Sequence, residues 1–247
     1  MIGIRGGRVR SYLSTFSCVG GLALLLMGSS AQANLVINTT RVIYNGAAHA
    51  VTVNVMNEGD QPSLMQSWLD SGNPDSIPDE VETPFSLLPP VARVNAGMSQ
   101  AVKITWNGDP LPTDRESVFY LNVMDIPPDP AGADSNYVQF AIRTRIKLFF
   151  RPKGLGGRAD NAPRQLVWQQ VGPAIRLSNP TPFHVSVNQI MDAQGSKFLS
   201  RDIGMVSPFG SHDFKTEPSV RTIKRTDLQI ETINDYGGNT VSVIHAR

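Results

Sequence analysis

One long β-prone segment, residues 136–152, constrains this chain more than any other stretch. Its sequence, NYVQFAIRTRIKLFFRP, has the period of two that is typical of a β-strand. One face would carry the apolar side chains of Val138, Phe140, Ile142, Ile146 and Leu148. The other face would carry the cations Arg143, Arg145 and Lys147. Most strands have about five or six residues. A strand this long predicts an edge that extends beyond its own sheet and that another chain covers.

The first 33 residues have the pattern of a secretory signal peptide. Three arginines precede an apolar run at residues 18–27, and Ala31-Gln32-Ala33 forms an A-x-A cleavage signal. The apolar run is shorter than the roughly 20 residues that span a bilayer. Cleavage would leave residues 34–247 as the mature chain. We therefore expect a soluble protein of the periplasm of a Gram-negative bacterium, without membrane insertion.

Charge and cysteine content restrict the mature chain further. Residues 1–33 hold three of the 22 Lys and Arg and none of the 21 Asp and Glu, so the net charge changes from +1 to −2. A nearly neutral chain gives no reason to expect binding to nucleic acid. The single cysteine, Cys18, lies within the expected signal peptide. The mature chain therefore has no internal disulfide and depends on its hydrophobic core for stability.

The pattern of the mature chain predicts an all-β fold. Short β-prone segments alternate with turn residues, and no helical periodicity persists. The first set predicts an immunoglobulin-like sandwich, with strands at residues 35–44, 50–56, 64–69, 85–95, 101–106, 117–126 and 136–150. The second set lies at residues 165–171, 174–178, 184–191, 222–234 and 239–245. Pro152 and Gly154 end the long strand. We therefore place the domains at residues 34–152 and 153–247.

No combination of residues predicts an active site. The four histidines, His49, His184, His212 and His245, lack the spacing of metal ligands, so we assign them ordinary surface or packing roles. The nucleophile-elbow, P-loop, zinc-protease and dinucleotide-binding motifs are missing from the sequence. We expect neither enzymatic activity nor a cofactor or metal. Trp68, Trp106 and Trp168 lie in β-prone segments and are expected to pack in cores.

Cations inside predicted strands are the remaining anomaly. Arg143 and Arg145 are best explained as solvated side chains on an exposed sheet face. Arg41 and Lys147 are less ordinary, because each lies well inside a β-prone segment and the second segment leads to the domain boundary. Two cations that converge on a cleft between domains would bind a carboxylate through charge-assisted hydrogen bonds.

These features resemble the periplasmic pilus-assembly chaperones of the chaperone–usher pathway, over essentially all of residues 34–247. The order and spacing of several motifs carry the resemblance: T-R-V-I-Y at 40–44, P-P at 89–90 with Arg93, D-R-E-S-V-F-Y at 114–120, I-P-P at 126–128, R-I-K-L-F-F-R-P at 145–152 and I-N-D-Y-G-G at 233–238. The resemblance implies two immunoglobulin-like domains in a boomerang arrangement. Its implied partners are pilus subunits and an outer-membrane usher, with a self-capping dimer when the chaperone is free.

The resemblance also implies roles for particular residues. Arg41 and Lys147 would anchor the C-terminal carboxylate of a subunit. A donor strand would insert Val138, Phe140 and Ile142 into the open groove of a subunit that lacks its last strand. An ion network would hold the domain angle through Glu116, Arg151 and Asp235. Strict alternation puts Lys147 on the face opposite the donor residues, so we expect a twist or a bulge between them.

The short connection from Pro128 to Val138 resembles that of the short-loop subfamily, which assembles rod-like pili with adhesive tips. The alternative is an immunoglobulin-like pilus structural subunit or adhesin, which usually has one domain and an N-terminal donor extension. Here residues 35–44 have the pattern of an integral first strand. A sugar-binding module or enzyme is less favoured, since neither aromatic platforms nor an acid–base set is visible.

Overall fold

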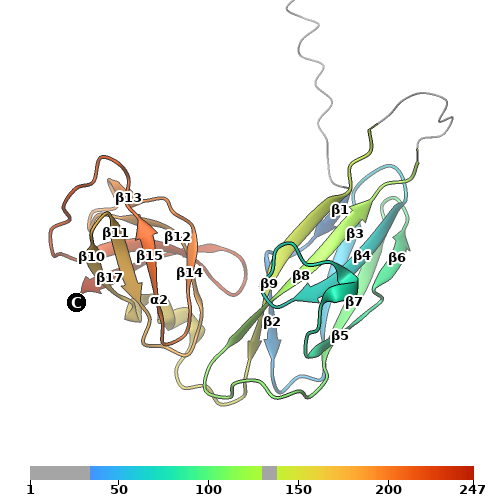
Figure 1. Ribbon diagram of the computed structural model, residues 1–247, viewed down its shortest axis with the longest axis horizontal. Coiled ribbons are helices and arrows are strands. Elements are labelled where there is room, and N and C mark those ends of the chain that lie inside the picture. The colour runs from blue at the N-terminus through green and yellow to red at the C-terminus, as the bar shows by residue number, and fades with distance from the viewer. Residues whose placement is uncertain (1–33, 130–137) are drawn as a thin grey trace, which may run out of the picture. The chain divides into compact units, whose positions relative to one another are not determined.

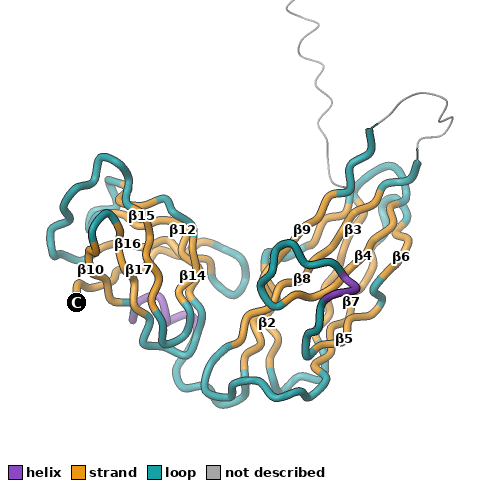
Figure 2. The backbone as a smooth tube through the Cα atoms, viewed as in Figure 1, coloured by secondary structure: helices purple, strands orange, loops and turns teal. Residues whose placement is uncertain are grey.

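The computed structural model describes residues 34–129 and 138–247, so the expected signal peptide at residues 1–33 lies outside the described part. The described chain is almost entirely strand and loop (Figure 2). Its short helical turns are η2 (Pro78–Glu80), η3 (Ala159–Asn161) and α2 (Ala162–Gln165). Two separate hydrophobic cores divide the chain, one built from residues 35–150 and one from residues 162–244. Each core is enclosed by its own strands (Figure 1).

The first core lies between two sheets. Their strands are β1 (Leu35–Ile37), β2 (Arg41–Asn45), β3 (Val51–Asn57), β4 (Ser63–Asp70), β5 (Phe85–Leu88), β6 (Val91–Val94), β7 (Ser99–Trp106), β8 (Ser117–Ile126) and β9 (Ile142–Arg151). One sheet has the order β1-β3-β7-β5 and the other β2-β9-β8-β4-β6. Alternating apolar residues such as Val53 and Val55 of β3 point into this core. The sheet that contains β9 positions the candidate site.

Two predicted strands of this domain are split in the structure. Residues 35–44 form β1 and β2, which belong to different sheets because the chain crosses from one sheet to the other between them. Residues 85–95 form β5 and β6, separated at Pro89-Pro90, since proline has no N–H to donate to a ladder. The Leu88–Pro89 peptide bond is cis. The long strand expected from residue 136 begins at Ile142.

The second core is enclosed by eight strands in one continuous order, β13-β12-β16-β17-β10-β11-β15, with β14 paired to β12. They are β10 (Val167–Val171), β11 (Ala174–Ser178), β12 (Val185–Met191), β13 (Phe198–Ser200), β14 (Gly204–Val206), β15 (Ser211–Lys215), β16 (Leu228–Ile233) and β17 (Asn239–Ala246). The sequence pattern did not predict β13, β14 and β15. These strands are short, and β15 buries only Phe214, so no alternation was visible. The strand expected from residue 222 begins only at Leu228.

Candidate functional site

Arg41 and Lys147 lie side by side. Arg41 is the first residue of β2, and it stands opposite Lys147 in the parallel pairing of β2 with β9. Both side chains leave the sheet on the face away from the core, because Val42 and Leu148, their neighbours along each strand, are core residues. Arg41 is only 7% exposed, and its Nη1 donates a 2.8 Å hydrogen bond to the carbonyl oxygen of Ile233. The two cations that the sequence singled out therefore lie together at one point of the sheet.

Neither cation is neutralised by an ion pair within the described residues. The Nε of Arg41 is buried without a hydrogen-bond partner there, and no hydrogen bond of the Lys147 ammonium is found in the same part of the chain. Burial lowers the pKa of Arg41 below its ordinary value, although the negative charges of Asp235 and Glu116 oppose this effect. Burial likewise lowers the pKa of Lys147, and the charges of Arg41 and Arg145 lower it further. An anion bound between them would relieve this repulsion.

The edge of β9 that leads to this cation pair is open. On one side, β8 pairs with β9 without interruption from Ile142 to Phe150. On the other side, β2 pairs only with Lys147–Arg151. Over residues 142–146, no described strand covers that second edge. An open edge presents backbone donors and acceptors to which another chain can pair.

The residues before this open edge are strongly exposed. The side chains of Val138 and Phe140 are 78% and 69% exposed, whereas Ile142, the first residue of β9, is partly buried. The register between β8 and β9 has no shift between Ile142 and Phe150, so a bulge in this part of β9 is not what separates the donor residues from Lys147. Simple alternation places Ile146 and Leu148 toward the core and Lys147 on the opposite face.

A second set of charges joins residues far apart in the sequence. The Nε of Arg151 lies 2.7 Å from Glu116 Oε1, and its Nη1 lies 2.7 Å from Asp235 Oδ2. Burial alone would lower the pKa of Arg151, but the hydrogen bonds and charges of Asp235 and Glu116 raise it. The other oxygen of Glu116 accepts a 2.8 Å hydrogen bond from the backbone N–H of His184 and lies 3.3 Å from its Nδ1. No motif in the sequence connects His184, which lies just before β12, with this network.

The end of β16 and the turn that follows it contact both charged sets. Ile233 supplies the carbonyl that binds Arg41, and Asp235 binds Arg151. Gly237 has a φ of 84°, and a Cβ there would clash with the hydroxyl of Thr40, next to Arg41. The I-N-D-Y-G-G motif therefore encodes a turn that packs closely against the start of β2.

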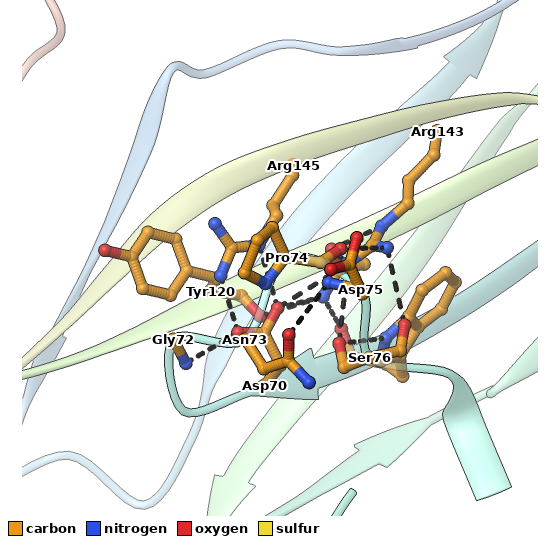
Figure 3. Close-up of polar contacts among 11 residues, drawn as sticks. Asp70, Gly72, Asn73, Pro74, Asp75, Ser76, Tyr120, Arg143 and Arg145 are labelled. Atoms are coloured by element: carbon orange, nitrogen blue, oxygen red, sulfur yellow. Dashed lines mark hydrogen bonds and ion pairs between the residues drawn. The ribbon is translucent and has the colours of Figure 1, made fainter. Parts of the chain in front are cut away.

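Arg143 and Arg145 are not the freely solvated side chains that the sequence suggested. Arg145 makes a two-bond contact with Asp70, which is 1% exposed, at distances of 2.9 and 2.6 Å (Figure 3). Arg143 donates to Asn122 Oδ1 and to the carbonyl oxygen of Pro74. Trp68 is buried outside the core cluster and lies under the guanidinium of Arg143, 4.8 Å from the ring centroid. Trp106 and Trp168 pack against or within the two cores, as expected.

Within residues 34–129 and 138–247, no group of three or more His, Cys, Asp or Glu side chains is arranged to hold a metal ion. No helix in these two ranges has the length and apolar character needed to cross a membrane.

Two known protein-family descriptions match most of the chain. Residues 34–156 match the family described as "Pili and flagellar-assembly chaperone, PapD N-terminal domain", and residues 161–242 match "Pili assembly chaperone PapD, C-terminal domain". The chain belongs to this family of pilus-assembly chaperones. The family consists of chaperones and not of enzymes. The match over both domains favours the chaperone over the alternative of a pilus structural subunit.

Similar proteins agree with this assignment. The chaperone protein FimB/FhaD of Bordetella pertussis is 38% identical over 230 residues, which cover 91% of this chain and 93% of that protein. The probable fimbrial chaperone YadV of Escherichia coli is 38% identical over 223 residues, covering 87% and 90%. Both similarities extend over the two domains. The chain is therefore related to these chaperones along nearly its whole length.

Solved structures give the same result. The CupB2 chaperone of Pseudomonas aeruginosa is 33% identical with a TM-score of 0.73, covering 86% of this chain and 100% of that chain. A chain from the complex of the Salmonella enterica SafA pilin with the SafB chaperone is 25% identical with a TM-score of 0.74, covering 88% and 98%. This chain is thus a periplasmic chaperone with an all-β fold of two immunoglobulin-like domains, as predicted.

Proposed function

We propose that this chaperone captures a pilus subunit by strand addition at β9 and anchors the subunit's C-terminal carboxylate at Arg41 and Lys147. One observation carries the proposal: the two unneutralised cations stand where the open edge of β9 ends. A carboxylate bound there would gain charge-assisted hydrogen bonds from both side chains. The residue pair would then fix where along β9 the subunit binds.

The arrangement of β2 explains why a chain end belongs at this point. Because β2 begins at Arg41 and occupies the edge from Lys147 onward, a strand added over residues 142–146 must stop there. A strand that runs parallel to β9 would meet the cations with its last residue. A free carboxylate at that residue supplies the negative charge that the site lacks.

The donor residues would supply most of the apolar burial. Val138, Phe140 and Ile142 have the alternation of a strand that fills a groove on the subunit. Fully burying such a side chain stabilises a complex by about 1.5–3 kcal/mol. Main-chain pairing does not depend on the partner's side chains, so one chaperone can bind several different subunits.

The captured subunit is an immunoglobulin-like domain that lacks its last strand. The donor strand fills its open groove and prevents aggregation until another subunit displaces the chaperone at an outer-membrane usher. A self-capping dimer would cover the same apolar residues when no subunit is bound. The structure of the SafA pilin with the SafB chaperone supports a pilin as the partner class.

Three finer assignments complete the proposal. The short connection between Pro128 and Val138 supports membership of the short-loop subfamily, although residues 130–137 of it lie outside the described part. The domains divide into residues 34–152 and 153–247, just after β9 ends at Arg151. The network of Glu116, Arg151 and Asp235 sets the orientation of the two domains more than their stability, since such ion pairs often contribute little net free energy.

Co-expression with a pilus subunit from the same bacterium tests this function. We expect the subunit to be recovered from the periplasm in a stoichiometric complex with the chaperone and to aggregate without it. The matched pair is wild type against the double variant Arg41→Ala/Lys147→Ala. Normal recovery of soluble subunit with the double variant would rule out the carboxylate anchor.

A further inference from the structure

The cations of β9 form a ladder with a spacing of two residues. Arg143, Arg145 and Lys147 leave the sheet on one face and stand opposite Met124, Asn122 and Tyr120 of β8. A slip of one residue turns every side chain of a strand to the other face, whereas a slip of two keeps each side chain on its own face. A partner strand whose end is held at Lys147 therefore has a competing register, two residues away, in which its end lies at Arg145. The side chains of the partner strand keep their faces in both registers, so burial of one face does not exclude the second.

The charge at the competing position is compensated by Asp70. Nε and Nη2 of Arg145 donate to the two carboxylate oxygens of Asp70, while its guanidinium lies 3.6 Å from the centroid of the Tyr120 ring (Figure 3). Asp70 also accepts hydrogen bonds from Asn122 Nδ2 at 2.8 Å and from the backbone N–H of Gly72 at 2.7 Å. Arg145 is therefore directed across β8 toward β4 and away from the open edge.

Arg143 is also held by partners within its own domain. Its Nε donates to Asn122 Oδ1 at 2.9 Å, its Nη1 donates to Pro74 O at 2.7 Å, and its Nη2 lies 3.7 Å from Asp70 Oδ2. Lys147 differs from both arginines, since no ion pair of its ammonium is found within the described residues. Two cations of the ladder, Arg143 and Arg145, are thus held by polar partners, and the third, Lys147, is not neutralised.

We propose that Asp70 determines the register of the bound subunit strand, because it holds Arg145 and leaves Lys147, with Arg41, as the place where a chain-terminal carboxylate finds uncompensated charge. Asp70 does not contact the subunit in this proposal; it is a positioning residue that acts through Arg145. The inference rests on the proposed carboxylate anchor. It adds to that anchor a reason why one register is selected over another that keeps every side chain on the same face of the strand.

The protonation state of Asp70 agrees with this role. Burial alone would raise the pKa of Asp70, but hydrogen bonds from Arg145, Asn122 and Gly72 outweigh burial and hold the pKa below its ordinary value. Asp70 is therefore ionised at neutral pH, and its compensation of Arg145 does not depend on small changes of pH.

Disulfide trapping with synthetic peptides measures the register directly. Residues 34–247 contain no cysteine, so the substitution Thr144→Cys places one thiol on the open edge of β9. The probes are peptides of alternating valine and threonine that end in a free carboxylate. Each carries one cysteine, and the cysteine moves along the peptide from one probe to the next. The peptide that is trapped reports which residue lies opposite position 144.

With Asp70 present, we expect trapping at one cysteine position. Asp70→Asn should add a second position, two residues nearer the carboxyl end, because Arg145 is then free to bind the carboxylate. The double variant Asp70→Asn/Arg145→Met should restore the single position, which mere loosening of the fold would not do. Peptides that end in an amide should never show the second position.

The outcomes separate this inference from the function on which it rests. A single, unchanged register in folded Asp70→Asn overturns the role of Asp70 and leaves the anchor intact. Unchanged trapping in Lys147→Ala overturns the anchor itself. If Asp70→Asn does not fold, Arg145→Lys takes its place, since it keeps the charge but loses the two-bond contact with Asp70. A second trapped position in Arg145→Lys supports the role of Asp70, and a single unchanged position overturns it.

Discussion

Arg41 and Lys147 face each other across the parallel pairing of β2 with β9, and each cation lacks an ion pair within the described residues. Two like charges held together in a partly buried place raise the free energy of the folded chain. Such an arrangement is expected where a ligand of opposite charge binds, because strained and perturbed groups concentrate at functional sites. The proposed anchor would therefore destabilise the free chaperone, and a bound subunit carboxylate would offset that cost.

The first prediction concerns capture. Arg41→Ala and Lys147→Ala should each abolish subunit recovery while the chaperone stays folded, since losing one partner of a hydrogen-bonded charge pair typically costs about 2–5 kcal/mol of binding free energy. Periplasmic yield of co-expressed subunit, with circular dichroism of the free chaperone as the folding control, measures this. Lys103→Met, at an exposed position of β7, is the matched control and should not affect capture.

The second prediction concerns the stability of the free chaperone. Lys147→Met should increase its free energy of unfolding at neutral pH by about 0.5–2 kcal/mol, because the substitution removes a partly buried charge that Arg41 and Arg145 repel. Urea unfolding of the variant and of wild type compares the two free energies. Equal stability at neutral pH would contradict the proposed repulsion.

The pH dependence of that difference has a definite sign. The folded-state pKa of Lys147 lies below its unfolded-state value of about 10.4, so between the two values the unfolded chain binds more protons. Wild-type stability therefore gains from this residue as pH rises through that window, and the penalty is complete below it. The gap between Lys147→Met and wild type should close as pH rises through the folded-state pKa toward about 10.4.

The sequence predicted which cations lie on strands better than it predicted their interaction partners. Period-two alternation was sufficient to place Arg41 and Lys147 on strands and to assign faces to residues 142–148, because that period depends only on backbone geometry. It did not identify Asp70 as the partner of Arg145, since 75 positions separate them and cross-strand pairing brings them together. Alternation alone also predicted one strand over residues 85–95, whereas the missing N–H groups of Pro89 and Pro90 divide it into β5 and β6.

The third prediction concerns the ion network. Asp235→Asn removes one bond partner of Arg151 but leaves the contact with Glu116, so we expect a loss of at most about 1 kcal/mol in stability. Small-angle scattering should show a broader distribution of interdomain distances, and subunit affinity should fall. Asp213→Asn, which breaks the exposed pair with Arg176 within the second domain, is the control and should change neither property. An unchanged scattering profile in Asp235→Asn would remove the orienting role.

The last prediction concerns the apolar residues before and at the start of β9. Phe140→Asp should leave the melting temperature within about 2 °C of wild type, because surface substitutions usually change stability by less than about 0.5 kcal/mol. Subunit capture should be lost, since the charge would enter an apolar groove without a partner. Ile142→Asp should also abolish capture, with a modest fall in melting temperature because Ile142 is partly buried. Ile203→Asp, at a position that is 74% exposed in the second domain, is the control for adding a charge. Thermal unfolding and co-expression yield together distinguish a residue that binds a subunit from one that packs in its own domain. A large fall in melting temperature for Phe140→Asp would mean that Phe140 packs in its own domain and does not bind a subunit.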